Sequence, residues 1–360
     1  MLAEGRTSGV YILELGGQDD AFAAREAASA ASGVDVVGAG LAAARAVTDR
    51  VRDLAFVRRA SDVVGHAEPD VPSARAVLAA ASVEREGSVA VRAVDVRGTT
   101  GVDTQRAERE LGQELVDRGF TVDLDEPDHE LRALFAGSPE ADSTDENAES
   151  PGDGDGICVL GWLTAESERG FGDRRPTDRP FFQPGSMDPI LARALVNIAG
   201  ARDGATVVDP MCGTGGLLLE AGLVGSRVVG TDAQAKMARG TRDNLRDALG
   251  DDGDFDVCRG DATRLPLADD CADAAVFDVP YGRQSKIEGD SLAELVGDAL
   301  SEAHRVASRV VVVADRSWTQ AAVDAGWTVG DHFERRVHRS LVRHVLVLER
   351  DEHGVGPTSG

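Results

Sequence analysis

The second half of the chain alternates between short apolar runs and amphipathic stretches, and this alternation limits the possible folds more than any other feature. The apolar runs predict strands at 205–208, 227–231, 255–258, 273–277 and 309–314. The amphipathic stretches predict helices at 214–223, 233–249, 291–307 and 317–325, and a late pair of extended segments follows near 327–334 and 338–348. Regular strand–helix alternation predicts a parallel, doubly wound α/β sheet whose ligands bind beyond the carboxyl ends of the strands.

The first part of the chain predicts a smaller α+β region. Strand character occurs at 9–15, 88–94 and 120–124, and helical periodicity at 20–31 and 104–119. Residues 138–156 contain many acidic and small residues and no basic one, so they cannot offset the entropy of ordering and predict a disordered loop. Strand-like sequence resumes at 157–162, so the loop interrupts this region. A cluster of glycine, arginine and proline at 166–178 predicts the domain boundary.

The charge balance is strongly acidic, with 63 acidic and 38 basic residues and a net charge of −25. In molar salt the Debye length falls to about 3 Å, so a dense acidic surface mainly supports solubility. We interpret the composition as an adaptation to a saline cytoplasm. The competing interpretation is that the charge excludes nucleic acid partners altogether, and charge alone favours it.

Cellular location follows from what the chain lacks. No run of about 18 apolar residues occurs, so no membrane span is expected. The first residues do not resemble a signal peptide, and the four cysteines show no close pairing. We therefore expect a cytoplasmic protein with reduced thiols and no zinc site.

A glycine-rich turn follows the first predicted strand of the second half. Asp209 ends that strand, and Gly213 and Gly215 precede the next helix. Glycines let the backbone turn sharply and approach a ligand closely. No Gly-Lys-Ser/Thr follows, which argues against a P-loop. Such a turn serves several nucleotide cofactors, and sometimes only tight packing.

Acidic residues also end the next three strands. Asp232 is placed to accept hydrogen bonds from both hydroxyls of a ribose, which also fits an NAD enzyme. Asp261, followed by Ala262, is placed where a carboxylate can meet an adenine amino group. The fourth strand leads to residues 278–281, Asp-Val-Pro-Tyr, and this motif distinguishes the possibilities.

The chemistry of the fourth motif can be argued from its groups. An exocyclic purine amine is a poor nucleophile, and acceptors aimed at its N–H groups free the lone pair to attack a sulfonium methyl held in line. Asp278 and the carbonyl of Val279 would be those acceptors. Pro280 would stiffen the turn, and Tyr281 would stack on the extruded base. In the alternative interpretation, Asp278 caps a helix and the following residues form a plain turn.

In this order the motifs resemble those of class I amino-methyltransferases, whose Asp-Pro-Pro-Tyr signature matches residues 278–281. Val279 replaces the first proline, and because that position supplies a backbone carbonyl we expect activity to survive with a looser turn. The resemblance implies S-adenosylmethionine as the cofactor and needs no metal. The residues expected at the cofactor are Asp209, Gly213, Gly215, Asp232, Asp261 and Ala262.

More specifically, residues 179–189, 278–285 and 338–341 look like those of archaeal tRNA (guanine(10)-N2)-dimethyltransferases. The region before them is similar to a THUMP domain with its ferredoxin-like partner, a module that docks the acceptor end of tRNA. The resemblance implies a ferredoxin-like region at 1–60, a THUMP-like domain at 61–168, a Rossmann-like methyltransferase domain at 179–350 and a flexible tail at 351–360. It also implies tRNA as the substrate and one or two methyl groups on a guanine N2.

Three alternatives stay open at this point. A THUMP methyltransferase acting on another tRNA guanosine would use the same chemistry. A DNA amino-methyltransferase would need a target-recognition domain, which the N-terminal region does not resemble, so we expect no DNA substrate. The third alternative is a tRNA-binding protein with a degenerate methyltransferase domain. For every one of these functions we favour a monomer.

Several side chains allow a functional and a structural interpretation. Arginines cluster at 58–59, 174–179 and 335–343, where they could contact phosphates or fill ordinary surface roles. Phe181 and Phe182 could stack on nucleotides or be buried. The seven histidines show no metal-ligand spacing, so we expect structural or surface roles for all of them: His66, His129, His304, His332, His338, His344 and His353.

Overall fold

The computed structural model describes residues 10–139, 156–280, 289–338 and 341–350. The chain divides into two compact units between Glu168 and Arg169, a point within the predicted boundary region. Among the described helices, none is long and apolar enough to cross a membrane.

The second unit is built on a seven-stranded sheet with the order β13-β12-β11-β14-β15-β17-β16. The prediction of a doubly wound α/β fold is confirmed: β11 to β15 run parallel. The last two strands form a hairpin that runs antiparallel to β15. The bounds are β11 Thr206–Asp209, β12 Arg227–Asp232, β13 Phe255–Arg259, β14 Ala274–Asp278, β15 Arg309–Ala314, β16 Thr328–His338 and β17 Leu341–Glu349.

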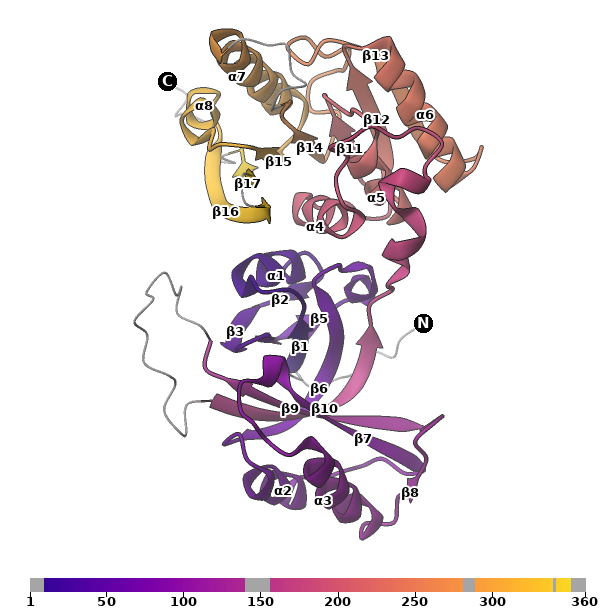
Figure 1. Ribbon diagram of the computed structural model, residues 1–360, viewed down its shortest axis with the longest axis vertical. Coiled ribbons are helices and arrows are strands. Elements are labelled where there is room, and N and C mark those ends of the chain that lie inside the picture. Colours follow the sequence, from indigo (N-terminus) through magenta and orange to yellow (C-terminus); the bar gives the residue numbers. More distant parts are fainter. Residues whose placement is uncertain (1–9, 140–155, 281–288, 339–340, 351–360) are drawn as a thin grey trace, which may run out of the picture. The chain divides into compact units, whose positions relative to one another are not determined.

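Helices cover both faces of this sheet. In Figure 1, α5 and α6 lie beside β12, and α7 and α8 lie beside β15 and the hairpin. Phe277 of β14 is fully buried with Val296 of α7 and Val312 of β15, as expected for a parallel strand covered on both faces. The bounds are α4 Pro189–Ala199, α5 Gly216–Leu223, α6 Ala235–Leu249, α7 Gly289–Val306 and α8 Thr319–Asp324.

The strand order places a topological switch point between β11 and β14. From β11 the chain proceeds outward through β12 to β13, and it then returns to place β14 on the other side of β11. Connections leave these two neighbouring strands in opposite directions, which opens a crevice beyond their carboxyl ends. Asp209 and Asp278 end these two strands.

The local sequence explains how α4 leads into this sheet. The Asp188 side chain caps the helix by accepting a hydrogen bond from the Ile190 N–H at 2.9 Å, and Pro189 occupies the first turn. The helix ends at Gly200, whose φ of 99° suits a residue without a Cβ. Apolar residues in between are buried against α5, β14 and β15.

The first unit contains an eight-stranded sheet with the order β3-β4-β1-β6-β10-β9-β7-β8. Leu111 and Leu115 of α3 pack on Leu131 and Phe135 of β9 to form part of its core. The strands are β1 Tyr11–Leu15, β3 Asp35–Gly38, β4 Leu41–Ala44, β6 Val57–Ala67, β7 Ser88–Asp95, β8 Thr121–Val122, β9 His129–Gly137 and β10 Gly156–Glu166, and β2 Ala31–Ser32 pairs with β5 Ala46–Val47. The helices are α1 Asp20–Ala27, α2 Val71–Ala80 and α3 Thr104–Val116.

Some predicted bounds of the first unit differ from the structure. The helix predicted at 20–31 ends at Ala27 because residues 31–32 pair with β5 instead. The predicted border between 60 and 61 falls inside β6, which pairs with both β1 and β10. Residues 1–60 and 61–168 therefore share one sheet, and their division into two named domains stays a prediction.

The acidic segment is an insertion between two paired strands. Gly137 of β9 and Gly156 of β10 are partners in the antiparallel register. The disordered loop was predicted at 138–156, and all but its ends lie outside the described part of the chain; residues 138–139 are described, and Gly156 already belongs to β10. The flexible tail predicted at 351–360 lies outside the described part as well.

Candidate functional site

The glycine-rich turn between β11 and α5 has the conformation that its glycines permit. Gly213 and Gly215 have φ angles of 53° and 78°, which other residues rarely adopt. A Cβ on Gly215 would lie 2.7 Å from Cγ2 of Thr241 on α6, whereas a Cβ on Gly213 would meet only open space and one carbonyl at 3.9 Å. Gly215 is therefore required because a side chain there would collide with Thr241. The missing side chain of Gly213 instead leaves open space beside the turn.

Asp232 at the end of β12 braces this turn. Its Oδ2 accepts a hydrogen bond from the Gly213 N–H at 3.1 Å, and its Oδ1 accepts one from the Gln234 N–H at 2.8 Å. Burial raises the pKa of Asp232, although these two N–H groups act in the opposite direction. A carboxylate oxygen has a second lone pair, so both oxygens can still accept from ribose hydroxyls.

Asp209 is a buried carboxylate close to two others. It is 2% exposed, and its Oδ1 accepts a hydrogen bond from the Met211 N–H at 2.9 Å. Burial raises the pKa of Asp209 well above its ordinary value, and the charges of Asp232 and Asp278 raise it further. The charges at the ends of β11, β12 and β14 therefore interact with one another.

Asp278 lies beside a buried arginine from the hairpin. Nη2 of Arg343 on β17 is 3.9 Å from Oδ2 of Asp278, and the Arg343 side chain is 8% exposed. The sequence suggested a possible phosphate contact for Arg343, but the structure places its charge against the end of β14. Its guanidinium therefore places a positive charge beside Asp278.

Val279 is held firmly by the sheet. Its side chain is 1% exposed, and its N–H donates a hydrogen bond to the Val313 carbonyl at 2.8 Å. A proline at this position has no N–H and could not make this bond. The Val279 N–H thus adds an anchor to β15, and the survival of activity with a looser turn stays a prediction. Pro280 follows and is half-buried, and Tyr281 lies outside the described residues.

Asp261 and Ala262 follow β13, the next strand beyond β12. Oδ1 of Asp261 accepts hydrogen bonds from the N–H and the hydroxyl of Thr263, at 3.0 and 2.8 Å. These bonds lower the pKa of the exposed Asp261. Ala262 is 7% exposed. One oxygen of Asp261 thus shapes a turn, and the predicted contact of Asp261 with an adenine amine stays a prediction.

A side chain that we did not predict fastens residues 179–189 to the glycine-rich turn. Asn244 of α6 is 1% exposed. Its Oδ1 accepts from the Phe181 N–H at 2.8 Å, and its Nδ2 donates to the carbonyls of Phe181 at 2.8 Å and Thr214 at 2.9 Å. The only sequence indication was a polar residue on the apolar face of an amphipathic helix.

The two phenylalanines have different roles. A Cβ on Gly240 would lie 2.0 Å from the Phe181 ring, so this ring packs directly on the backbone of α6. Phe182 is 40% exposed and stays a candidate for stacking. Ser186 Oγ lies 3.0 Å from Thr214 Oγ1, which adds a second link to the turn.

Two arginines of the cluster at 174–179, Arg174 and Arg179, make contacts within the fold, whereas Arg175 is exposed. Nε and Nη2 of Arg174 lie 2.8 and 3.2 Å from the carboxylate of Glu220 on α5, which is fully buried, and Arg193 of α4 lies 2.9 Å from the same group. Phe171 packs under these guanidinium groups. Arg179 is 8% exposed and donates to the Arg174 carbonyl. These contacts anchor the start of the second unit.

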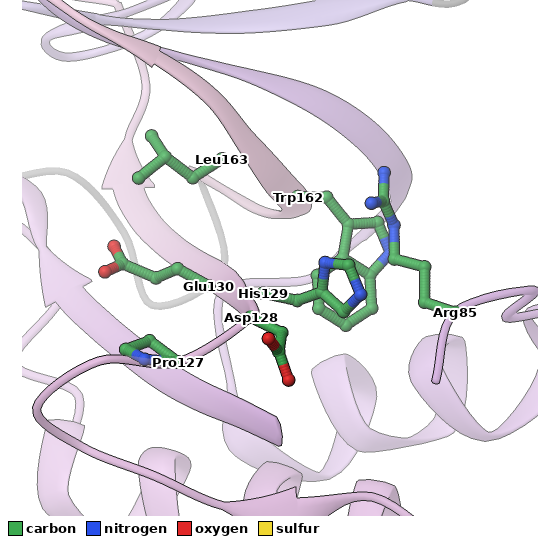
Figure 2. A pocket seen from close by; sticks show the side chains of 7 residues that line it. All are labelled: Arg85, Pro127, Asp128, His129, Glu130, Trp162 and Leu163. Atoms are coloured by element: carbon green, nitrogen blue, oxygen red, sulfur yellow. The ribbon is translucent and has the colours of Figure 1, made fainter. Parts of the chain in front are cut away.

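The first unit has a separate pocket of about 310 Å³, which contains none of the predicted site residues. Figure 2 shows Arg85 and His129 gathered at the ring of Trp162, whereas the Glu130 side chain points away from that ring. Asp128 also lines the pocket. The Arg85 guanidinium is 5.2 Å from the Trp162 ring centre, a cation–π contact. Pro127 and Leu163 complete the lining.

Comparison with known proteins identifies the family. Residues 176–344 match the family described as RMKL-like, methyltransferase domain. A tRNA (guanine(10)-N2)-dimethyltransferase from Methanothermobacter thermautotrophicus is 35% identical over 306 residues, which cover 82% of this chain and 83% of that protein. The enzyme of the same name from Methanocaldococcus jannaschii is 29% identical, covering 74% and 72%.

A more distant relative shares only part of the chain. Human U6 snRNA (guanine-N(2))-methyltransferase THUMPD2 is 32% identical over 114 residues, which cover 31% of this chain and 22% of that protein. The similarity to the archaeal enzymes is much longer and exceeds the length of either compact unit. The chain therefore belongs to the tRNA (guanine(10)-N2)-dimethyltransferase family and is a methyltransferase that uses S-adenosylmethionine as its methyl donor.

Proposed function

We propose that this protein transfers methyl groups from S-adenosylmethionine to the N2 amine of guanosine 10 in tRNA, giving N2-methyl- and N2,N2-dimethylguanosine. The observation that carries this proposal is the convergence of Asp209, Asp232 and Asp278 at the carboxyl ends of β11, β12 and β14. The first two supply acceptors for a cationic cofactor, and the third lies where the target amine would enter.

The cofactor side of the site follows from charge and space. Burial is the main cause of the raised pKa of Asp209, and the charges of Asp232 and Asp278 add to it. S-Adenosylmethionine carries a sulfonium and an ammonium group, which would offset that added repulsion. Gly213 and Gly215 let the backbone approach the methionine part, and Asp232 accepts from the ribose. Asp261 and Ala262, after the neighbouring β13, would bound the adenine.

The target side is formed by residues 278–281. The Asp278 carboxylate and the Val279 carbonyl accept hydrogen bonds from the two N–H groups of the guanine amine, which leaves its lone pair free to attack the methyl carbon. The bond between sulfur and that carbon breaks, the proton leaves N2 for Asp278 or water, and neutral S-adenosylhomocysteine departs. Pro280 stiffens the turn, and Tyr281, which lies outside the described residues, is proposed to stack on the base.

The first unit is proposed to select the RNA, with a ferredoxin-like part at 1–60 and a THUMP-like part at 61–168. The names of the archaeal and human relatives share guanine-N2 chemistry but differ in the RNA. The same chemistry on different RNA targets also fits one alternative, methylation of another tRNA guanosine by the same site. We further propose that the protein acts as a monomer in the cytoplasm and does not methylate DNA.

The test is methylation of an unmodified homologous tRNA transcript in molar KCl, read by mass spectrometry of nucleosides. A transcript with adenosine at position 10 is the matched control, and U6 snRNA and duplex DNA are tested in parallel. We expect N2-methylated guanosine only in the tRNA that carries guanosine 10. Methylation of the position-10 control would support another target, and cofactor binding without any methylated guanosine would contradict the proposal.

A further inference from the structure

The β16–β17 hairpin brings together two histidines and a glutamate on one face. His332 and Glu334 are two residues apart on β16, and Glu334 is the register partner of His344 on β17. One potential ligand atom from each of the three lies within 4.8 Å of the others. Their separation in sequence conceals this cluster, because only the antiparallel register places His344 beside the other two.

We propose that His332, Glu334 and His344 bind a divalent transition-metal ion, with Zn²⁺ the best match. Two imidazoles and a carboxylate form a common zinc ligand set. Nε2 of His332 and Nδ1 of His344 are 3.0 Å apart, and Nδ1 of His344 is 3.6 Å from Oε1 of Glu334. Zinc bonds of about 2.0–2.1 Å place tetrahedral ligand atoms about 3.3 Å apart, close to both separations.

The side chains must turn to complete such a site, because the ring nitrogens of His332 and His344 now face each other in a hydrogen bond. His332 and Glu334 are exposed, so their rotamers can adjust, whereas the His344 side chain is 17% exposed and more restricted. The two imidazole rings are stacked, with centres 5.3 Å apart. Three protein ligands leave a fourth position for water, as in zinc sites that are not closed.

A metal at this place would stiffen the hairpin next to the proposed active site. His344 pairs with Ala314 at the end of β15, and the next residue toward the hairpin turn is Arg343, which lies 3.9 Å from Asp278. Coordination of His344 would hold the start of β17 in place. It would thereby also fix the backbone of the neighbouring Arg343, whose side chain lies beside Asp278. The ion would therefore have a structural role.

The experiment measures metal binding by the full-length protein, without using activity. Cys258 and Cys271 are exposed thiols that also bind zinc, so both are first alkylated. Zn²⁺ binding is then followed by calorimetry, and Co²⁺ binding by its visible absorption, which distinguishes nitrogen and oxygen ligands from sulfur. The variants are His332→Gln, Glu334→Gln and His344→Gln. His66→Gln, an exposed histidine on β6 of the other unit, is the matched control.

We expect one equivalent of metal in the wild type and in His66→Gln. Each ligand variant should bind it more than about 10-fold more weakly, since changes of residues that merely support metal ligands already cost that much. Added Zn²⁺ should raise the Tm of the wild type but not of His344→Gln. Thermal unfolding without metal shows that each variant is folded. Absence of saturable binding, or equal affinity in all variants, would overturn the proposal and leave the His332–His344 contact as a hydrogen bond alone.

Discussion

The backbone N–H of Val279 donates a hydrogen bond to the Val313 carbonyl at 2.8 Å, at the position where the related signature has a proline. Replacing Val279 by proline removes this donor and leaves a buried carbonyl without that partner. We expect Val279→Pro to lower the free energy of unfolding by about 1–3 kcal/mol. Thermal unfolding in molar KCl measures the change, and Val279→Ala, which keeps the N–H, is the comparison for the lost side-chain volume. A proline variant as stable as the wild type would show that the bond contributes nothing.

Asp278 and Asp232 should differ in which step they affect. Asp278→Ala should abolish turnover and leave the cofactor dissociation constant nearly unchanged, because the carboxylate is proposed to contact the guanine amine. Asp232→Ala should weaken cofactor binding by about 1–3 kcal/mol, since it removes a charged acceptor. Calorimetric titration with S-adenosylhomocysteine and single-turnover methylation separate the two effects. Equal loss of cofactor affinity in both variants would contradict the division of roles.

Arg343 should act as a positioning residue for Asp278. Arg343→Met removes the charge 3.9 Å from that carboxylate, so we expect kcat to fall more than KM changes. Arg343→Lys keeps a positive charge and should restore part of kcat. Steady-state kinetics with saturating cofactor give both constants. If both variants have a lower Tm but an unchanged kcat, or if Arg343→Lys restores no part of kcat, the charge of Arg343 does not position Asp278.

Cofactor binding should depend on pH through Asp209. Burial raises the pKa of Asp209 above its ordinary value of 3.8. Below pH 3.8 the neutral carboxyl therefore contributes fully to the stability of the fold. This contribution is lost as the pH rises through the raised pKa. The cationic cofactor favours the ionised form, so affinity should rise over the same pH range with release of a proton. Calorimetry in buffers of different ionisation enthalpy detects that proton. Asp209→Asn should remove the pH dependence of cofactor affinity, weaken cofactor binding and raise the Tm of the cofactor-free protein. If the affinity of this variant still depends on pH, the titrating group is Asp232.

Gly215 should tolerate a side chain less well than a glycine of similar backbone conformation elsewhere. Gly204 and Gly215 have φ angles of 74° and 78°, but a Cβ meets nothing within 4 Å at Gly204 and meets Thr241 at 2.7 Å at Gly215. Gly204→Ala should cost about 1–2 kcal/mol for the left-handed conformation alone, and Gly215→Ala clearly more. Their Tm values provide the comparison. Equal losses would mean that α6 moves away from the turn without cost.

The sequence alone was enough to predict the elements that carry the site. Strand and helix periodicity is a local property, so the bounds from β11 to β17 were predicted to within a few residues. Asp209, Asp232 and Asp278 could be placed at one edge because parallel strands all present their carboxyl ends there. The resemblance carried by the same motifs predicted the family and its cofactor.

Tertiary structure decided the contacts that no local pattern contains. Arg343 reaches Asp278 from another strand, Asn244 holds Phe181 across 63 residues, and His332 meets His344 only through the register of the hairpin. Such contacts depend on which backbones pair and in what register, and a shift by one residue turns each side chain to the opposite face. The sequence therefore determined which residues stand at the strand ends, and only the packed fold determined which charges and ligand atoms face them.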